Sequence, residues 1–198
     1  MEYSIIILCL ILSAFFSGME IAFISSNKIY LEIEKKQDSY LSIILTKLTR
    51  KPSKFIAAML VGNNIALVLY GFYMSDLIVR WLANSGSELS LTATILVQTG
   101  IAAIIILLTS EFLPKVLFQI YANTLIKVFS VPAYIFYKFF YYISTFIMWL
   151  SDLLLRQFFK TGADPVQLFF SKVELGNYIN EQISTMENQE EVDSEIQI

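Results

Sequence analysis

Residues 3–26 read YSIIILCLILSAFFSGMEIAFISS, a mainly apolar segment of 24 residues. A helix needs about 20 such residues to cross the hydrocarbon core of a bilayer, so this segment is long enough to span a membrane. Its polar residues include Ser13, Ser17, Gly18 and Glu20. The two serines and the glutamate stand at i, i+4 and i+7, which places them on one face of a helix. The segment therefore predicts a membrane helix with one polar stripe.

Two later apolar segments, residues 55–79 and 91–113, also gather their polar residues in one short cluster. The clusters are Gly62, Asn63 and Asn64 in the second segment, and Ser110, Glu111, Pro114 and Lys115 at the end of the third. Polar groups inside a span are costly and usually face a bundle interior or an ion path. Their ligand atoms are oxygens, which hard cations such as Mg2+, Na+ and Ca2+ prefer. The pattern predicts an all-α membrane protein with an oxygen-lined cation site.

The composition supports a membrane protein and argues against other classes. Of 198 residues, 56% are hydrophobic and 16% are charged, against roughly 25% charged in soluble domains. Residues 173–198 hold seven acids and no base, which argues against a nucleic-acid partner. With no histidine and one cysteine, Cys9, the chain predicts no intrachain disulfide and no zinc or iron–sulfur site. It also lacks a nucleophile–base pair and a phosphate loop, so we expect no enzyme.

A fourth apolar stretch, residues 128–159, differs from the other three. It is rich in aromatic residues and contains Lys138 and Arg156. Aromatic side chains interrupted by cations are typical of the membrane interface, which favours a juxtamembrane helix, and a fourth span is the alternative. Residues 28–52 mix apolar and basic residues, which predicts amphipathic helices lying on the membrane.

The basic residues predict the orientation in the membrane. Residues 27–54 contain seven lysines and arginines, whereas Arg80 is the base beside the turn at residues 82–90. By the positive-inside rule, the first segment is cytoplasmic and the turn is outside. The N-terminus is then outside and the acidic C-terminal tail is inside. The first span begins with Glu2 and is too long for a cleaved signal peptide, so we expect it to persist in the mature protein.

The three polar clusters lie at a similar predicted depth. Ser17 precedes the cytoplasmic end of its span by ten residues, and Asn63 follows the start of the second span by nine. At about 1.5 Å per residue, both lie roughly 14–15 Å from the cytoplasmic face. Glu111 lies in the cytoplasmic half of the third span. Pro114 has no N–H for the carbonyl of Ser110, which leaves that oxygen for another partner such as a cation.

Each cluster also has a purely structural interpretation, and the sequence leaves these open. The serines would bond their own helix, and the two asparagines would join neighbouring helices. Glu111 and Lys115 would form an i, i+4 ion pair, with Lys115 reaching toward the headgroups. Asp76 and Arg80 have the same spacing and are expected to pair. Glu20 would face a cytoplasmic vestibule.

Three motifs resemble those of one family. Residues 15–22, FFSGMEIA, are similar to its first-helix motif F-F-S-G-S-E-T-A, and residues 60–64, LVGNN, match its L-V-G-N-N motif. Residues 110–115, SEFLPK, are similar to G-E-x-x-P-K. With order and spacing kept over residues 1–160, the chain resembles the transmembrane domain of the CorB/CorC–cyclin-M (CNNM) family of magnesium transporters. Met19, Ile21 and Ser110 depart from the usual serine, threonine and glycine.

The resemblance implies a homodimer of three-span protomers with a belt of juxtamembrane helices, in the bacterial inner membrane. It implies Mg2+ bound among the helices and exported, with Na+ as a coupling ion. The implied ligands are Ser17, Asn63 and Glu111, followed by Asn64, Glu20 and carbonyls near Gly62 and Ser110, while Gly18, Pro114 and Lys115 shape the site.

The resemblance further divides the chain into a transmembrane domain, residues 1–160, and an acidic cytoplasmic helical segment, residues 161–198. Family members continue from such a segment into CBS domains that bind ATP, so we expect this chain to be a fragment ending before them. We interpret the acidic segment as a solvated helix face, with a second, weak divalent-cation site as the alternative. A gliding-motility-associated branch of the family provides the other functional alternative, a membrane-anchored interaction module without transport.

Overall fold

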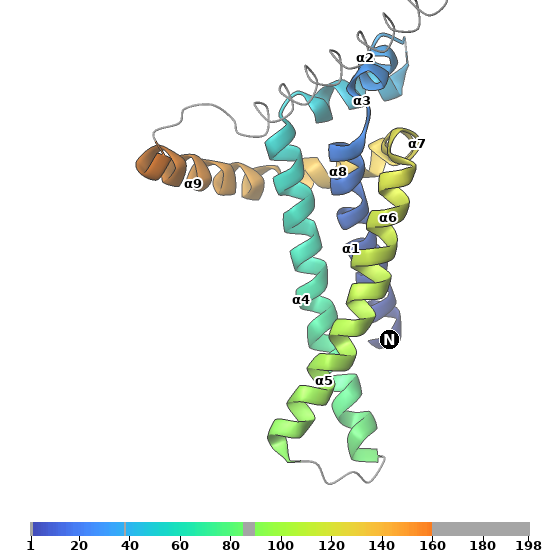
Figure 1. Ribbon diagram of the computed structural model, residues 1–198, viewed down its shortest axis with the longest axis vertical. Coiled ribbons are helices and arrows are strands. Elements are labelled where there is room, and N and C mark those ends of the chain that lie inside the picture. Colours follow the sequence, from blue (N-terminus) through green and yellow to red (C-terminus); the bar gives the residue numbers. More distant parts are fainter. Residues whose placement is uncertain (1, 38, 85–89, 160–198) are drawn as a thin grey trace, which may run out of the picture. The chain divides into compact units, whose positions relative to one another are not determined.

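The computed structural model describes residues 2–37, 39–84 and 90–159, and every regular element among them is a helix (Figure 1). Three helices are long and apolar enough to cross a membrane. They are α1 (Glu2–Ser25), α4 (Pro52–Asn84), and the continuous helix Leu91–Ile120. This third span comprises α5 (Leu91–Ile106), the π-helical η1 (Leu107–Phe112) and α6 (Leu113–Ile120). The predicted all-α architecture with three spans is confirmed.

The second and third spans are longer than the sequence predicts. α4 has 33 residues, or about 50 Å at 1.5 Å per residue, whereas the predicted segment ended at residue 79. The hydrocarbon core is only about 30 Å thick, so α4 extends beyond it. Hydropathy detects the apolar part of a helix and misses polar turns that continue it at either end.

Short helices occupy the predicted juxtamembrane segments. Residues 28–52 contain α2 (Lys28–Lys35) and α3 (Tyr40–Thr49). The aromatic stretch is divided into the end of α7 (Ala122–Val128), α8 (Ser130–Phe139) and α9 (Tyr141–Phe159). None of these is among the helices apolar enough to cross the membrane. The interfacial interpretation is therefore favoured over a fourth span.

The chain divides into two compact units, residues 1–151 and 152–198. Of the second, the structure describes only residues 152–159, which end α9. The predicted acidic segment, residues 161–198, lies outside the described residues. The boundary predicted at residue 160 stays a prediction.

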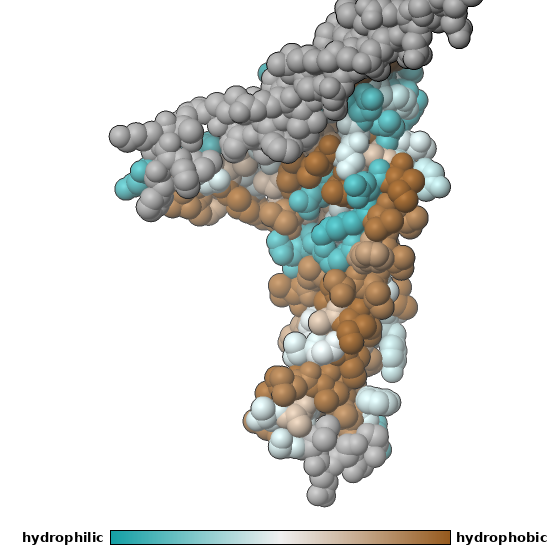
Figure 2. All heavy atoms as spheres, viewed as in Figure 1, coloured by the Kyte–Doolittle hydropathy of each residue, from teal (hydrophilic) through white to brown (hydrophobic). Residues whose placement is uncertain are grey.

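Two apolar clusters hold the first unit together. One joins α1, α2, α3, α4, α7 and α8, and in it Phe16 of α1 packs against Phe136 of α8 with ring centroids 4.8 Å apart. The other joins α1, α4 and α5 around Tyr70 and includes buried Cys9. Ser13 lies between Cys9 and Phe16 in the sequence of α1, so the polar stripe begins where the two clusters meet. Figure 2 shows hydrophilic residues gathered between α4 and α6, surrounded by apolar surface.

The short helices are attached to one another by polar contacts. Lys127 Nζ of α7 donates to Glu34 Oε1 of α2 at 2.7 Å, and Glu34 is buried. The backbone N–H of Asn27 donates to Asn123 Oδ1 at 2.8 Å. The hydrogen bond from Lys127 lowers the pKa of the Glu34 carboxyl, and the same bond raises the pKa of Lys127. These contacts fix α2 to α7 beside the spans.

The attachment of α2 is expected to depend on pH. Because the pKa of Glu34 is lower in the folded state than its ordinary value of about 4.5, its ionisation stabilises the fold above that value. The contribution is lost as pH falls through the lowered pKa. Thermal unfolding of Glu34→Gln should show a lower Tm than the original chain at pH 7, with the difference closing below pH ~4.

Glu32→Gln is the matched control, because Glu32 is exposed and pairs with Lys35 on its own helix. It should change the Tm little at either pH. An equal loss of Tm in the two variants at pH 7 would contradict a specific role for the Glu34–Lys127 pair.

Candidate functional site

Asn63 of α4 connects all three spans. Ser13 Oγ of α1 donates to Asn63 Oδ1 at 2.7 Å, and Asn63 Nδ2 donates to Glu111 Oε1 of η1 at 3.2 Å. Ser13 is fully buried and Asn63 is 7% exposed. The amide thus uses its acceptor toward one helix and its donor toward the other. Such bonds orient the side chains and also hold the helices together.

Glu111 has a second partner in Lys115, one turn further along the same helix. Lys115 Nζ donates to Glu111 Oε2, and the two side chains are 44% and 24% exposed. The i, i+4 ion pair, which was the structural alternative for these two residues, is therefore present. Glu20 of α1, which is half-buried, lies within electrostatic range of both residues. Two carboxylates and one ammonium therefore share the region between α1 and η1–α6.

Ser17 is the exceptional residue of this group. It is fully buried, and its hydroxyl makes no hydrogen bond to any part of the chain that the structure describes. Its neighbours on the same helical stripe reach the other spans: Ser13 bonds Asn63, while Glu20 lies near Glu111 and Lys115. A buried hydroxyl without a partner costs about 1–3 kcal/mol. Ser17 is thus an unsatisfied oxygen between two ends of a polar network.

The third span changes its helical form at the site. Residues Leu107–Phe112 form a π-helix, in which Leu113 N–H bonds the carbonyl of Leu108. Single-turn π-helices frequently occur at functional sites. The side chain of Ser110 is buried, and its Oγ donates to the carbonyl of Leu10 in α1 at 3.3 Å. The role of the Ser110 carbonyl as a ligand stays a prediction, as does that of carbonyls near Gly62.

The two glycines of the motifs allow close packing of aromatic rings. A Cβ on Gly18 would lie 2.6 Å from the ring of Phe118, and one on Gly62 would lie 2.7 Å from the ring of Phe16. Phe16 belongs to α1 and Phe118 to α6. The glycines therefore determine how closely α1 approaches α4 and α6, which sets the spacing of the polar groups.

Asn64 is not brought together with the other predicted residues. Its side chain is exposed, and its amide donates to the carbonyl of Leu60 on its own helix at 2.9 Å. Asn63 and Asn64 are adjacent, so a helix turns them about 100° apart. The sequence pair could not reveal which asparagine faces the bundle.

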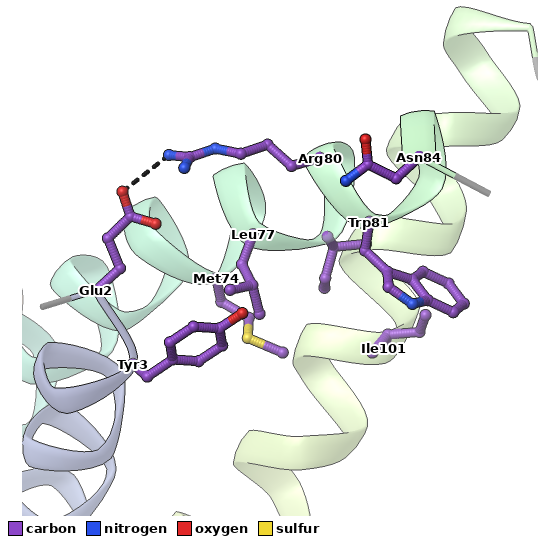
Figure 3. Close-up of a pocket in the computed structure, with 9 residues that line it drawn as sticks. Glu2, Tyr3, Met74, Leu77, Arg80, Trp81, Asn84 and Ile101 are labelled. Atoms are coloured by element: carbon purple, nitrogen blue, oxygen red, sulfur yellow. Dashed lines mark hydrogen bonds and ion pairs between the residues drawn. The ribbon is translucent and has the colours of Figure 1, made fainter. Parts of the chain in front are cut away.

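The pairing of Asp76 with Arg80 is also confirmed, and it has a partner that the sequence did not suggest. Arg80 bonds Glu2 Oε1 of α1 at 2.9 Å, which joins α1 to α4 (Figure 3). These two residues line a pocket of about 680 Å³ that also includes Trp81 and Ile101. It lies at the other end of α4 from α2 and α3, away from Asn63.

Among the described residues, no group of three or more histidine, cysteine or acidic side chains could hold a metal ion. The site is instead built from hydroxyl, amide and a small number of carboxylate oxygens. Mg2+ is commonly bound by one or two carboxylates, because it keeps several waters. The donor set fits a hard cation, whereas a thiolate- or imidazole-binding metal is not matched.

Comparison with known proteins agrees with this architecture. The family model described as cyclin M transmembrane N-terminal domain (CNNM) matches residues 4–191. The UPF0053 inner membrane protein YfjD of Escherichia coli is 28% identical over 110 residues, which cover 56% of this chain and 24% of that protein. A UPF0053 protein of Haemophilus influenzae is 27% identical over 121 residues, covering 61% of this chain and 27% of the relative. The chain thus matches about a quarter of each relative's length, and it belongs to the CNNM family as a membrane protein matching its transmembrane N-terminal domain.

Proposed function

We propose that the chain binds Mg2+ among α1, α4 and η1 and forms the membrane part of a Mg2+ transporter. The observation that supports this most directly is Ser17, whose buried hydroxyl has no partner among the described residues. It stands on the stripe that also contains Ser13 and Glu20. A cation between Ser17, Asn63 and Glu111 would satisfy that oxygen.

The proposed site requires a change at Glu111. Without a cation, Lys115 neutralises the Glu111 carboxylate through Oε2, and Asn63 donates a hydrogen bond to the other oxygen, Oε1. An arriving Mg2+ would compete with the Lys115 ammonium, since two cations close to one carboxylate repel each other. Displacement of Lys115 toward Glu20 or solvent would then accompany binding. The π-helix provides a place where the third span can adjust.

The remaining parts of the proposal follow the family. The transport direction is efflux, with Na+ entry as the driving reaction, and nucleotide control would require the CBS region. The homodimer is also proposed: α5 has no buried residue, and Leu96, Leu108 and Phe112 expose apolar surface along the third span. Lipid and a second copy are both suited to such a surface.

One observation favours the second candidate, an interaction module without transport. The network of Ser13, Asn63, Glu111 and Lys115 is complete without an ion. In that case the polar residues would only join the helices. The unpartnered Ser17 favours the ion-binding proposal over this alternative.

Thermal unfolding of the purified chain in Mg2+, Ca2+ or Na+ distinguishes the two candidates. A ligand that binds the folded state raises its stability by RT ln(1 + [L]/Kd), about 2.7 kcal/mol at 100 times Kd. We expect a saturable rise in Tm with Mg2+, reduced in Ser17→Ala. The alanine removes an unpaired hydroxyl, so it should not lower the Tm without Mg2+. An equal Tm in the presence and absence of Mg2+ would support the interaction module.

A further inference from the structure

A second pocket lies beside the start of α4, at the end of the first unit that we interpret as lying at the membrane interface. It has a volume of about 540 Å³. Its walls come from the end of α3 with the following residues, and from α8 with the start of α9. The lining consists of bases and tyrosines: Lys47, Arg50, Lys51, Lys138, Tyr134, Tyr137, Tyr141 and Tyr142. Among the residues that the structure describes, no acidic side chain lines it.

The four bases of this pocket lack counter-ions among the residues that the structure describes. The ion pairs there involve Glu2, Glu32, Glu34, Asp76 and Glu111, whose partners are other bases. Like charges brought together without a carboxylate repel one another, so the arrangement favours an anion. Lys47, Arg50, Lys51 and Lys138 are all exposed, which leaves their charged groups accessible.

The tyrosines contribute a second kind of recognition. Lys47 Nζ lies 5.4 Å from the ring centroid of Tyr134, and buried Lys54 lies 3.1 Å from that of Tyr141. Lys54 holds the pKa of the Tyr141 hydroxyl below its usual value, with a smaller contribution from Lys51. Tyrosines at this level present rings to the apolar region and hydroxyl donors to headgroups.

Apolar surface continues outward from the basic pocket. Phe139 follows Lys138 directly and is 75% exposed, and Ile135 of the same helix is 61% exposed. A soluble anion would leave this apolar surface exposed to water, whereas the acyl chain of a lipid would cover it. The combination of phosphate-binding bases with adjacent exposed apolar residues is typical of lipid recognition at the cytoplasmic interface.

We propose that this pocket binds the phosphate headgroup of an anionic membrane lipid, held by Arg50 and Lys51 from one wall and Lys138 from the other. Arginine can bind two phosphate oxygens with its planar fork, and the lysines supply point charges. The tyrosine hydroxyls donate to the remaining oxygens. The site is separate from Asn63 and Glu111, and it does not depend on the proposed transport of Mg2+.

The test measures lipid binding by the whole 198-residue chain in neutral detergent. Phosphatidylglycerol is titrated, with phosphatidylcholine, inorganic phosphate and glycerol phosphate in parallel, and bound lipid is counted by native mass spectrometry alongside the Tm. The pocket variant is Arg50→Gln/Lys138→Gln. The matched control is Lys35→Gln/Lys36→Gln, which removes two bases from the neighbouring α2 region without touching the pocket lining.

We expect the original chain and the control to retain phosphatidylglycerol in preference to phosphatidylcholine, with saturation. The pocket variant should bind it about 30-fold more weakly, since it loses two bases and each base near a lipid surface contributes on the order of 1 kcal/mol. Its Tm without lipid should equal that of the original chain. A second double variant, Arg50→Lys/Lys138→Arg, should bind the lipid, because it keeps one positive charge on each wall of the pocket.

Three results would overturn the proposal. Equal losses in the pocket and control variants would show attraction to net charge only. Full competition by inorganic phosphate, with no preference for the lipid, would assign the pocket to a soluble anion. The third result combines two observations: lipid has no effect on the chain, and changing the seven acids of residues 173–198 to amides lowers its Tm. Together they would assign the pocket to the chain's own acidic segment.

Discussion

Replacing Glu111 with glutamine is expected to reduce Mg2+ flux into or out of proteoliposomes containing this chain by at least about 10-fold, because losing even a residue that only orients a metal ligand typically costs about 10- to 100-fold. The substitution keeps the shape of the side chain and the oxygen that accepts from Asn63. It removes the negative charge that would hold Mg2+ and that Lys115 now neutralises. Flux is measured with a Mg2+-sensitive dye inside the vesicles.

Asp76→Asn is the matched control, because it makes the same chemical change, carboxylate to amide, at another acidic residue of a membrane-spanning helix. Asp76 pairs with Arg80 near the far end of α4 and does not contact the candidate site. It should leave the flux near that of the original chain. If Glu111→Gln carries as much Mg2+ flux as the original chain and Asp76→Asn, the result would count against transport through this site.

A second pair of variants separates ion binding from helix joining. Asn63→Ala and Gln98→Ala each remove an amide that bonds another span, since Gln98 donates to Ser75. Each should lower the free energy of unfolding by about 0.6 kcal/mol per interhelical bond removed, which is one bond for Gln98 and two for Asn63. Only Asn63→Ala should also abolish the rise in Tm with Mg2+. Equal responses to Mg2+ would indicate that Asn63 serves packing alone.

Gly62→Ala is expected to destabilise the chain although alanine normally favours a helix. The new Cβ would lie 2.7 Å from the ring of Phe16, which is 2% exposed and packed against Phe136. Overpacking of this kind costs about 1–3 kcal/mol, which exceeds the gain of up to about 1 kcal/mol in helix propensity. We expect a Tm lower by a few degrees. The separation of α1 from α4 should increase, weakening the Ser13–Asn63 bond and Mg2+ binding.

Gly71→Ala provides the control on the same helix. A Cβ there would meet nothing within 4 Å, so the substitution should leave the Tm unchanged or raise it. Adding Phe16→Leu to Gly62→Ala should recover part of the lost stability, because the smaller side chain makes room. A Gly62→Ala chain as stable as Gly71→Ala would refute the packing argument.

The three spans and their polar clusters were predictable from the sequence because each depends on local composition. In a bilayer, the backbone N–H and C=O groups of a span are all paired only in an α-helix or a closed β-barrel. A continuous run of about 20 apolar residues therefore predicts a membrane-spanning helix. The spacing of Ser13, Ser17 and Glu20 predicted one helical face for the same reason. The ion pairs Glu111–Lys115 and Asp76–Arg80 followed from their i, i+4 positions.

Features that depend on contacts between helices could not be predicted in this way. The sequence did not distinguish Asn63 from Asn64, and hydropathy could not indicate that Arg80 reaches Glu2. The π-helix was also missed, because Pro114 predicts only that a hydrogen bond is lost and does not determine how the helix adjusts.

The amino-acid sequence by itself determined that this is a three-span helical membrane protein with oxygen donors in each span, since helix formation and membrane insertion depend on residues that are neighbours in the chain. Only the tertiary structure decided which of those donors meet, because the rotation and spacing of the helices are set by packing between distant residues. Phe16 against Gly62 and Phe118 against Gly18 bring the helices close. That approach places Ser13 against Asn63 and leaves the hydroxyl of Ser17 buried without a partner among the described residues.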